Sequence, residues 1–385
     1  MFFGTFSRGS DPQYRKVSES MKVTGRVAKI QTVIQQGADE RNRFVMTRVV
    51  SVDADGEPLQ AQKRKGSIVL VAGTYLNFEF FELGGGSKRL PEYLAERGID
   101  VYGYSPRTRL IPERKCKDDA AYCEIFRQWG FRTYISDIEF IRDAASKNNP
   151  ATLPVIGGYS LGAALVYGAL NTSPKSWAGA LIVEGGIYYK DPSISQQFEK
   201  PCRELKAPGS KSFLDDGRTF RRLAQLSRNK PNHLSPFLPV LTNRWVFQLG
   251  VTKNNKVPNE FVPHARLAAG SMFGGLRFSP VAVAEQVALD MNEYDPTPVY
   301  ADWFCAVAGD RTFSNGLDKF TAPVLALKAG QAYGPYMQDS LDLLGSSNIQ
   351  IIEKPDYGHA DLIGAKDHLD SWEGPIWTWL SETIN

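Results

Sequence analysis

The chain has 385 residues, of which 42% are hydrophobic and 23% are charged, and its formal net charge is only +3. This is ordinary globular usage, and a chain of this length can bury a core without a metal or a disulfide framework. The small net charge and the lack of a basic run with interleaved aromatic residues argue against nucleic-acid binding, so we expect no nucleic-acid partner.

No stretch of the sequence approaches the roughly 18 consecutive apolar residues that span a bilayer, so we expect no transmembrane segment. The opening residues, MFFGTFSRGSDPQYRK, lack the basic start and the apolar stretch of about 7–15 residues that mark a secretory signal. We therefore expect a cytoplasmic protein on the sequence as given, or a secreted or periplasmic one if a signal has been removed.

Strands that alternate with helical segments extend through most of the chain, which is the pattern of a mostly parallel sheet covered by helices on both faces. The expected strands are residues 22–34, 43–52, 67–72, 100–104, 153–157, 178–183, 323–327 and 348–353. The first two are candidates for an antiparallel pair, whereas the apolar run SIVLVA at 67–72 is typical of a central parallel strand. The expected helices are residues 88–97, 133–146, 161–170, 281–290, 337–344 and 371–384, the last interrupted by Pro375.

The alternation stops after Gly186 and resumes only after about Phe320, across a stretch rich in Pro, Arg, Asn and aromatic residues. A structureless loop of that size inside a compact domain is uncommon. We therefore expect a large, mainly helical lid or cap at 187–320, inserted between the sixth and seventh strands of a core formed by residues 1–186 and 321–385. Most of its aromatic side chains should form its own small core, and the rest should line an apolar pocket for an acyl chain or a bulky hydrophobic alcohol.

Four cysteines leave the redox compartment open. Cys116 and Cys123 bracket the short polar loop KDDAAY and could close a small disulfide. Cys202 and Cys305 both fall in the expected lid and could form a second bridge, while four unpaired thiols are the alternative. The Cys-x6-Cys spacing matches no zinc pattern, so no metal site is expected.

The sharpest signal in the sequence is the pentapeptide Gly158-Tyr159-Ser160-Leu161-Gly162, between an apolar strand and an Ala-rich helix. A G-x-S-x-G motif in this context is a tight strand-to-helix turn that exposes the serine hydroxyl above the sheet. There the helix dipole and the backbone N–H of Leu161 can stabilise a developing oxyanion. The sequence therefore predicts Ser160 as a nucleophile, and the alternative is a tight turn with an incidental serine.

A serine hydroxyl needs a base to become nucleophilic at neutral pH, and the chain has four histidines. His359 lies in the loop after the strand at 348–353, and a parallel sheet keeps its active site in the loops at the carboxyl ends of its strands. His233 and His264 fall in the expected lid, and His368 lies beyond the loop in a charged stretch. We therefore predict His359 as the base.

From about Ile68 to the C-terminus the sequence resembles the α/β-hydrolase superfamily, particularly its lipase and esterase branch. The residues that carry the resemblance are the GYSLG elbow, Val71-Ala72-Gly73-Thr74 after the strand at 67–72, and Tyr357-Gly358-His359-Ala360-Asp361. The resemblance covers the core but not the expected lid. It implies an α/β-hydrolase fold and a serine nucleophile, not a particular substrate.

The resemblance implies one of two positions for the acid of a Ser-His-acid triad. Members often carry an aspartate a few residues after the strand that is 323–327 here, but the following loop, KAGQAYG, holds no carboxylate. Others place the acid after the strand that follows the elbow helix, where this chain has Glu184. A carboxylate that ends an apolar strand is costly to bury unless it is paired, and an imidazolium would pair with it. We therefore predict that Glu184 orients His359, although it could instead bind only local backbone N–H groups. Asp361, Asp356 and Asp310 are the other candidates, and Asp361 is expected to support the histidine loop.

The oxyanion hole departs from the pattern of the superfamily in one residue. Many members have His-Gly after the strand at 67–72, where this chain has Ala72-Gly73. Backbone N–H groups bind the oxyanion, so the loss of that histidine does not remove the hole. The resemblance implies the N–H of Leu161 together with that of Thr74 or Tyr75.

Together these features predict a serine hydrolase that cleaves a carboxylic ester with a medium or large hydrophobic group through an acyl-enzyme, with no metal or organic cofactor. An amidase or an acyltransferase would use the same triad. A non-catalytic protein that keeps the fold and binds a ligand in its pocket is the alternative from another class, supported by the missing acid after 323–327. The expected partner is a small-molecule ester, and the oligomeric state stays open.

Overall fold

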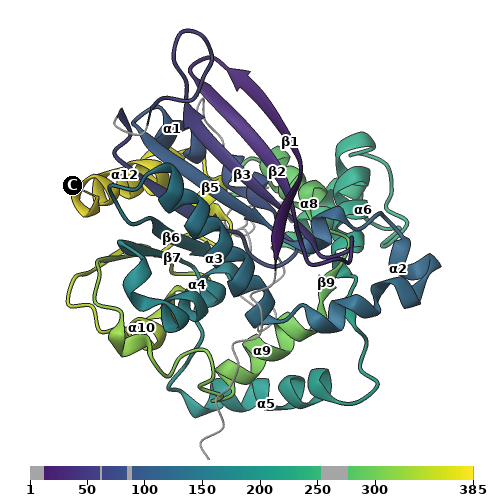
Figure 1. Ribbon diagram of the computed structural model, residues 1–385. Coiled ribbons are helices and arrows are strands. Elements are labelled where there is room, and N and C mark those ends of the chain that lie inside the picture. Colours follow the sequence, from purple (N-terminus) through teal and green to yellow (C-terminus); the bar gives the residue numbers. More distant parts are fainter. Residues whose placement is uncertain (1–12, 61–62, 85–88, 253–275, 385) are drawn as a thin grey trace, which may run out of the picture.

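The computed structural model describes residues 13–60, 63–84, 89–252 and 276–384, which form a sheet with helices on both of its faces (Figure 1). The strand order in the sheet is β1-β2-β3-β5-β4-β6-β7-β10-β11. Neighbours run parallel from β5 across to β11, whereas β1, β2, β3 and β5 pair antiparallel. The strands are β1 Tyr14–Thr24, β2 Val27–Gln36, β3 Arg43–Ser51, β4 Gly66–Val71, β5 Ile99–Ser105, β6 Val155–Tyr159, β7 Gly179–Val183, β10 Val324–Ala329 and β11 Ile349–Lys354.

The central strands are buried on both faces because successive side chains point to opposite sides of a sheet. In β4, Ile68 and Leu70 pack into one apolar layer and Val69 and Val71 into the other. The second layer holds α3 Phe131–Asn148, α4 Leu161–Thr172 and α10 Met337–Leu341, and the first holds α1 Leu90–Ala95, α11 Asp361–Gly364 and α12 Gly374–Thr383. The mostly parallel sheet and the central position of the strand at 67–72 are thereby confirmed.

The N-terminal edge of the sheet differs from the prediction of a single strand at 22–34. The chain forms a hairpin in which β1 pairs with β2, and its turn passes through Gly25 at φ +60°. Glycine adopts this conformation without a steric cost. Because β1 is exposed along almost its whole length, its sequence carries no burial pattern that identifies a strand.

The C-terminal helix also begins differently from the helix predicted at 371–384. A π-helical turn covers Leu369–Glu373, and α12 starts at Gly374 with Pro375 in its first turn. At this position the missing N–H of proline has no intrahelical acceptor to lose. Pro375 therefore starts this helix and does not interrupt it.

Residues 187–320, which we call the β7–β10 segment, carry most of the remaining helices. Its residues 253–275, with His264, lie outside the described part of the chain. Both disulfides that the sequence left open are present: Cys202–Cys305 joins α5 to α9, and Cys116–Cys123 joins α2 Lys115–Asp118 to the 3₁₀ helix η4 Ala120–Gln128. Within the described residues no helix has the length and apolar character to span a membrane. The elements in the described part of the segment are α5 Pro192–Lys206, β8 Phe213–Leu214, α6 Asp216–Asn229, α7 Asn243–Val251, α8 Val281–Asp290, β9 Asp295–Pro296, α9 Thr297–Val307 and the 3₁₀ helix η6 Leu317–Lys319.

Candidate active site

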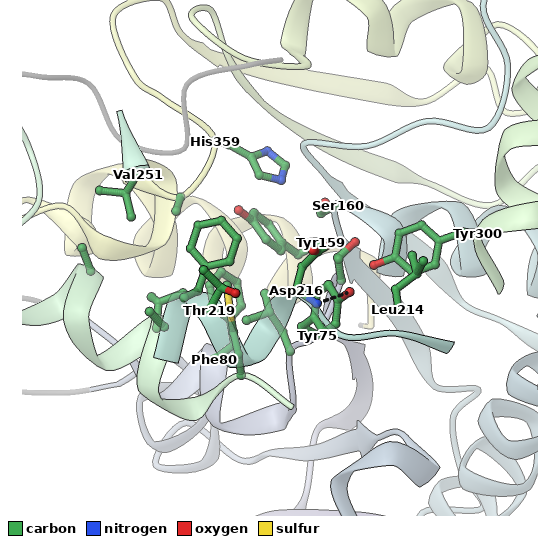
Figure 2. A pocket seen from close by; sticks show the side chains of 18 residues that line it. Tyr75, Phe80, Tyr159, Ser160, Leu214, Asp216, Thr219, Val251, Tyr300 and His359 are labelled. Atoms are coloured by element: carbon green, nitrogen blue, oxygen red, sulfur yellow. Dashed lines mark hydrogen bonds between the residues drawn. The ribbon is translucent and has the colours of Figure 1, made fainter. Parts of the chain in front are cut away.

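Ser160 lies in the turn between β6 and α4, and it lines a pocket together with His359 (Figure 2). Its φ of +58° and ψ of −124° are strained for a residue with a side chain. Both glycines of the turn are needed. A Cβ on Gly158 would lie 2.4 Å from the carbonyl oxygen of Gly162, and a Cβ on Gly162 would lie 2.1 Å from that of Val71. The turn is therefore as tight as a G-x-S-x-G motif requires.

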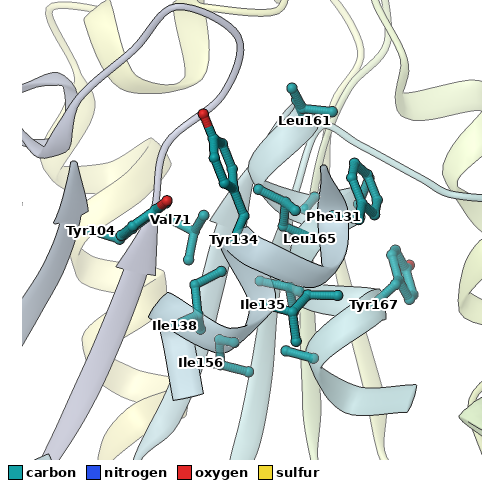
Figure 3. Packing of buried hydrophobic residues seen from close by; sticks show 14 of the residues in the cluster. Val71, Tyr104, Phe131, Tyr134, Ile135, Ile138, Ile156, Leu161, Leu165 and Tyr167 are labelled. Carbon is teal, nitrogen blue, oxygen red and sulfur yellow. The ribbon is translucent and has the colours of Figure 1, made fainter. Parts of the chain in front are cut away.

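Helix α4 anchors this turn in the interior of the protein. All of its residues from Leu161 to Leu170 are buried, as is typical of a helix that is apolar all round. Helix α3 packs against it, and Ile135 and Ile138 belong to the same apolar cluster as Leu165 (Figure 3). A Cβ on Gly168 would lie 2.6 Å from Cδ1 of Ile135, so this glycine lets the two helices approach closely.

Glu184 follows β7 next to the elbow, has a φ of +50° and is fully buried. Its Oε1 accepts a hydrogen bond from the Ala329 N–H (2.5 Å), and its Oε2 accepts one from the Tyr333 N–H (3.0 Å). Oε2 also lies 3.2 Å from Nδ1 of His359. The carboxylate thus contacts both the loop after β10 and the imidazole.

His359 lies in the loop after β11, and only 3% of its surface is exposed. Its ring contacts two aromatic side chains, with centroid distances of 4.6 Å to Tyr159 and 4.9 Å to Tyr333. The Glu184 contact at Nδ1 leaves Nε2 on the other side of the ring, and in Figure 2 the ring points toward Ser160. Tyr333 was not singled out by the sequence, because a tyrosine in a loop carries no signal of its own.

The other candidate acids lie elsewhere. Asp361 is buried, and its Oδ2 accepts a hydrogen bond from the Gly358 N–H (3.1 Å), so it supports the loop that carries His359. Asp356 and Asp310 are exposed on the surface. The structure thus brings Glu184 against the imidazole and places two of the alternatives on the surface.

Two of the three residues whose backbone N–H groups we expect in an oxyanion hole, Leu161 and Thr74, lie next to Ser160 in the chain or in its pocket. Leu161 is the first residue of α4, so its N–H has no acceptor within the helix. Thr74 lines the same pocket as Ser160. A Cβ on Gly73 would lie 2.8 Å from Cβ of Ser160, so the absence of a side chain lets this loop pass close to the serine.

The N–H of Tyr75 is used differently. It donates a hydrogen bond to Oδ2 of the buried Asp295 at 2.7 Å. Since an N–H donor engaged in this way is not free to bind an oxyanion, we do not retain Tyr75 as a donor of the hole. The sequence gave no sign of Asp295, which lies in the short strand β9 of the β7–β10 segment.

Comparison with known proteins gives structural neighbours only, since neither a family model nor a curated protein matches the sequence. A structure from Sulfolobus solfataricus, described as that of a candidate lipase, matches over 96% of this chain and 99% of its own, at 16% identity and a TM-score of 0.64. A highly thermostable carboxyl esterase from Bacillus coagulans matches over 94% and 100%, at 11% identity and a TM-score of 0.54. A thermophilic esterase from Thermogutta terrifontis matches over 92% and 99%, at 12% identity and a TM-score of 0.51.

The chain has the α/β-hydrolase fold. In this hydrolase fold the pocket at Ser160 is a cavity of about 380 Å³ between the carboxyl edge of the sheet and the β7–β10 segment. A cavity of this size fits a small-molecule ligand. Among the described residues that line it, Asp216 is the one acidic or basic side chain apart from His359. Most of the wall is apolar, formed by side chains such as Leu76, Phe80, Leu214, Phe220, Val251, Val287 and Met291.

The other histidines in the described part of the chain, His233 and His368, lie outside this site. His368 is buried, with Nδ1 2.5 Å from Oε2 of Glu373. His233 is exposed in the loop between α6 and α7. Among the described residues, no group of three or more His, Cys, Asp or Glu side chains could hold a metal ion.

Proposed function

We propose that the protein is a serine hydrolase that cleaves a carboxylic ester with a medium or large hydrophobic group through an acyl-enzyme. The observation that carries the proposal is the 3.2 Å contact of the buried Glu184 with His359, which lines one pocket together with Ser160 on its strained turn. A nucleophile, a base and a group that orients the base are the parts that such a reaction needs. The candidate lipase and the esterases named above support the same class through their shared fold.

In the proposed reaction the Oγ of Ser160 attacks the ester carbonyl carbon while Nε2 of His359 takes the hydroxyl proton. The N–H groups of Leu161 and Thr74 bind the oxyanion of the tetrahedral intermediate. The intermediate collapses, the alcohol leaves with the proton from Nε2, and an acyl group remains on Ser160. Water, deprotonated by His359, then attacks the acyl carbon and releases the carboxylic acid. Glu184 holds the imidazole in the required tautomer and stabilises the imidazolium.

We propose in addition that the β7–β10 segment is a lid over this site. Helices α6, α7 and α8 supply Phe220, Val251 and Val287 to the pocket, and the core supplies Leu76 and Phe80. This apolar wall supports a hydrophobic acyl or alcohol group, because burial of apolar surface stabilises such a group in the pocket.

The test is hydrolysis of p-nitrophenyl esters of increasing acyl length by the wild type and by Ser160→Ala. Ser173→Ala is the matched control, since Ser173 caps the other end of α4. We expect Ser160→Ala to lose at least about a thousand-fold in kcat and Ser173→Ala to stay near wild type. Equal rates for Ser160→Ala and the wild type would overturn the proposal, and the chain length with the highest kcat/KM would measure the size of the pocket.

A further inference from the structure

Tyr75 connects the loop after β4 to the β7–β10 segment through three hydrogen bonds. Its N–H donates to Oδ2 of Asp295 (2.7 Å), and its carbonyl oxygen accepts from the Asn292 N–H (2.7 Å). Its phenol oxygen accepts from the Asp216 N–H (3.3 Å), the bond drawn in Figure 2. These contacts hold Tyr75 at a φ of +59°, which is unfavourable for a residue with a side chain.

Asp295 is the only side chain among these three partners, since the other two act through their backbones. It is 5% exposed, and its Oδ2 also accepts a hydrogen bond from the Tyr300 hydroxyl (2.9 Å). The Thr74 side chain bonds to Tyr300 in turn. Within the described residues no Lys, Arg or His forms an ion pair with Asp295. Its Oδ2 therefore accepts two hydrogen bonds, of which one comes from the Tyr75 N–H itself.

This arrangement decides which amide of the loop can bind an oxyanion. Thr74 and Tyr75 carry consecutive N–H groups beside Ser160, and Asp295 engages the second of them. The Thr74 N–H is the other amide of this pair, and Thr74 lines the same pocket as Ser160. Thr74 is also restrained through its side chain and Tyr300, so one carboxylate constrains both residues of the loop.

We propose that Asp295 is a positioning residue for the oxyanion hole, because it holds the Tyr75 N–H and the Tyr300 hydroxyl and so fixes the Thr74 N–H toward Ser160. The inference rests on the proposed function, and it makes the β7–β10 segment part of the catalytic geometry. An oxyanion forms only in the transition state, so a displaced donor lowers kcat and leaves KM nearly unchanged. If the contact were merely structural, its loss would instead lower stability and impair kcat and KM together.

The test compares Asp295→Ala, which removes the acceptor, with Asp295→Asn, which keeps an acceptor oxygen of the same reach. Asp302→Asn and Asp302→Ala are the matched controls, since Asp302 on α9 also accepts a backbone N–H of the core, that of Phe131 at 3.0 Å. We expect Asp295→Ala to lower kcat on a p-nitrophenyl ester at least about ten-fold, with KM within about three-fold of wild type. Asp295→Asn should recover most of this loss, and the Asp302 variants should not change kcat.

Amide hydrogen exchange of the peptide around Tyr75 gives a second readout that needs no activity. We expect faster exchange of this peptide in Asp295→Ala and unchanged exchange in the Asp302 variants. Unchanged kcat and unchanged exchange in Asp295→Ala would overturn the inference, as would equal kcat losses in the Asp295 and Asp302 variants. If the wild type hydrolyses no ester, the proposed function fails. Faster exchange would then still support the Asp295–Tyr75 contact, and unchanged exchange would refute it.

Discussion

Replacement of Glu184 by Gln removes one negative charge at nearly constant volume from the middle of the proposed triad. The carboxylate accepts from Ala329 N–H at 2.5 Å and from Tyr333 N–H at 3.0 Å, and it lies 3.2 Å from Nδ1 of His359. A glutamine offers only one acceptor oxygen to these three groups. One of its two orientations therefore has to be adopted, and each has a defined cost.

In one orientation the glutamine oxygen faces Tyr333 and His359, and its NH₂ group faces the Ala329 N–H. A hydrogen bond to a charged acceptor, worth about 1.5–3 kcal/mol, is then lost and two donors meet. In the other orientation the NH₂ group donates to Nδ1. The imidazole then carries its proton on Nε2, where it cannot accept the proton of Ser160.

Both orientations lower turnover far more than stability. Loss of the orienting charge in a triad of this kind costs about 10⁴-fold in kcat, which is roughly 5 kcal/mol of transition-state free energy. The cost in folding free energy, about 1.5–3 kcal/mol, is smaller than the typical stability of about 5–15 kcal/mol, so the variant should fold.

The assay is kcat on a p-nitrophenyl ester together with the thermal unfolding midpoint of each variant. Asp361→Asn is the control, because Asp361 is a buried carboxylate of the loop that carries His359. We expect Asp361→Asn to lose much less than Glu184→Gln in kcat. The assignment of the acid is wrong if Asp361→Asn loses about a thousand-fold or more in kcat while Glu184→Gln keeps its turnover.

Three further predictions concern the elbow, Asp295 and the pocket. Gly162→Ala puts a Cβ 2.1 Å from the Val71 carbonyl oxygen and should cost about 3 kcal/mol or more in urea unfolding. In contrast, Gly250→Ala in α7, where the nearest contact is at 3.9 Å, should gain about 0.5–1 kcal/mol. Burial raises the pKa of Asp295 from its usual 3.8 to about 7, although the hydrogen bonds from the Tyr75 N–H and the Tyr300 hydroxyl act to lower this pKa. The native state therefore keeps a proton that the unfolded chain releases. The free energy of unfolding should therefore fall by up to about 4 kcal/mol as the pH rises from about 4 to about 7, and Asp295→Asn should flatten this dependence. Stability of Asp295→Asn that still falls by the same amount would contradict the prediction. Ala288→Trp narrows the pocket and should lower kcat/KM for long p-nitrophenyl esters more than for the acetate, whereas a uniform loss would place Ala288 outside the acyl site.

Much of the fold could be predicted because parallel strands covered on both faces are continuous apolar runs. Strands β4, β6 and β7 are of this kind, and the structure confirms them within a few residues of the predicted bounds. Strand β1 could not be predicted in the same way, since it is exposed along almost its whole length. The β7–β10 segment gave few predicted helices, and α5 and α6 were missed: α5 has no buried residue and α6 has only Gly217, Ala224 and Ser227.

The approach of Glu184 to His359 illustrates what a sequence can predict about a site. The two residues are 175 positions apart, but each follows a strand of the parallel part of the sheet, and the carboxyl ends of such strands meet at one edge. The contact between Tyr75 and Asp295 spans 220 positions and has no such rule behind it. Asp295 lies in a two-residue strand outside the main sheet, so only the folded chain brings it to the loop.

The most direct test of the proposed serine hydrolase is intact-protein mass spectrometry after reaction with a fluorophosphonate. Attack by an activated serine displaces fluoride and leaves one covalent phosphonyl group on the protein. We predict a single adduct on the wild type, located on Ser160 by peptide mapping, and none on Ser160→Ala. An unmodified wild type at a saturating dose, or an adduct that persists in Ser160→Ala, would contradict the assignment of Ser160 as the nucleophile.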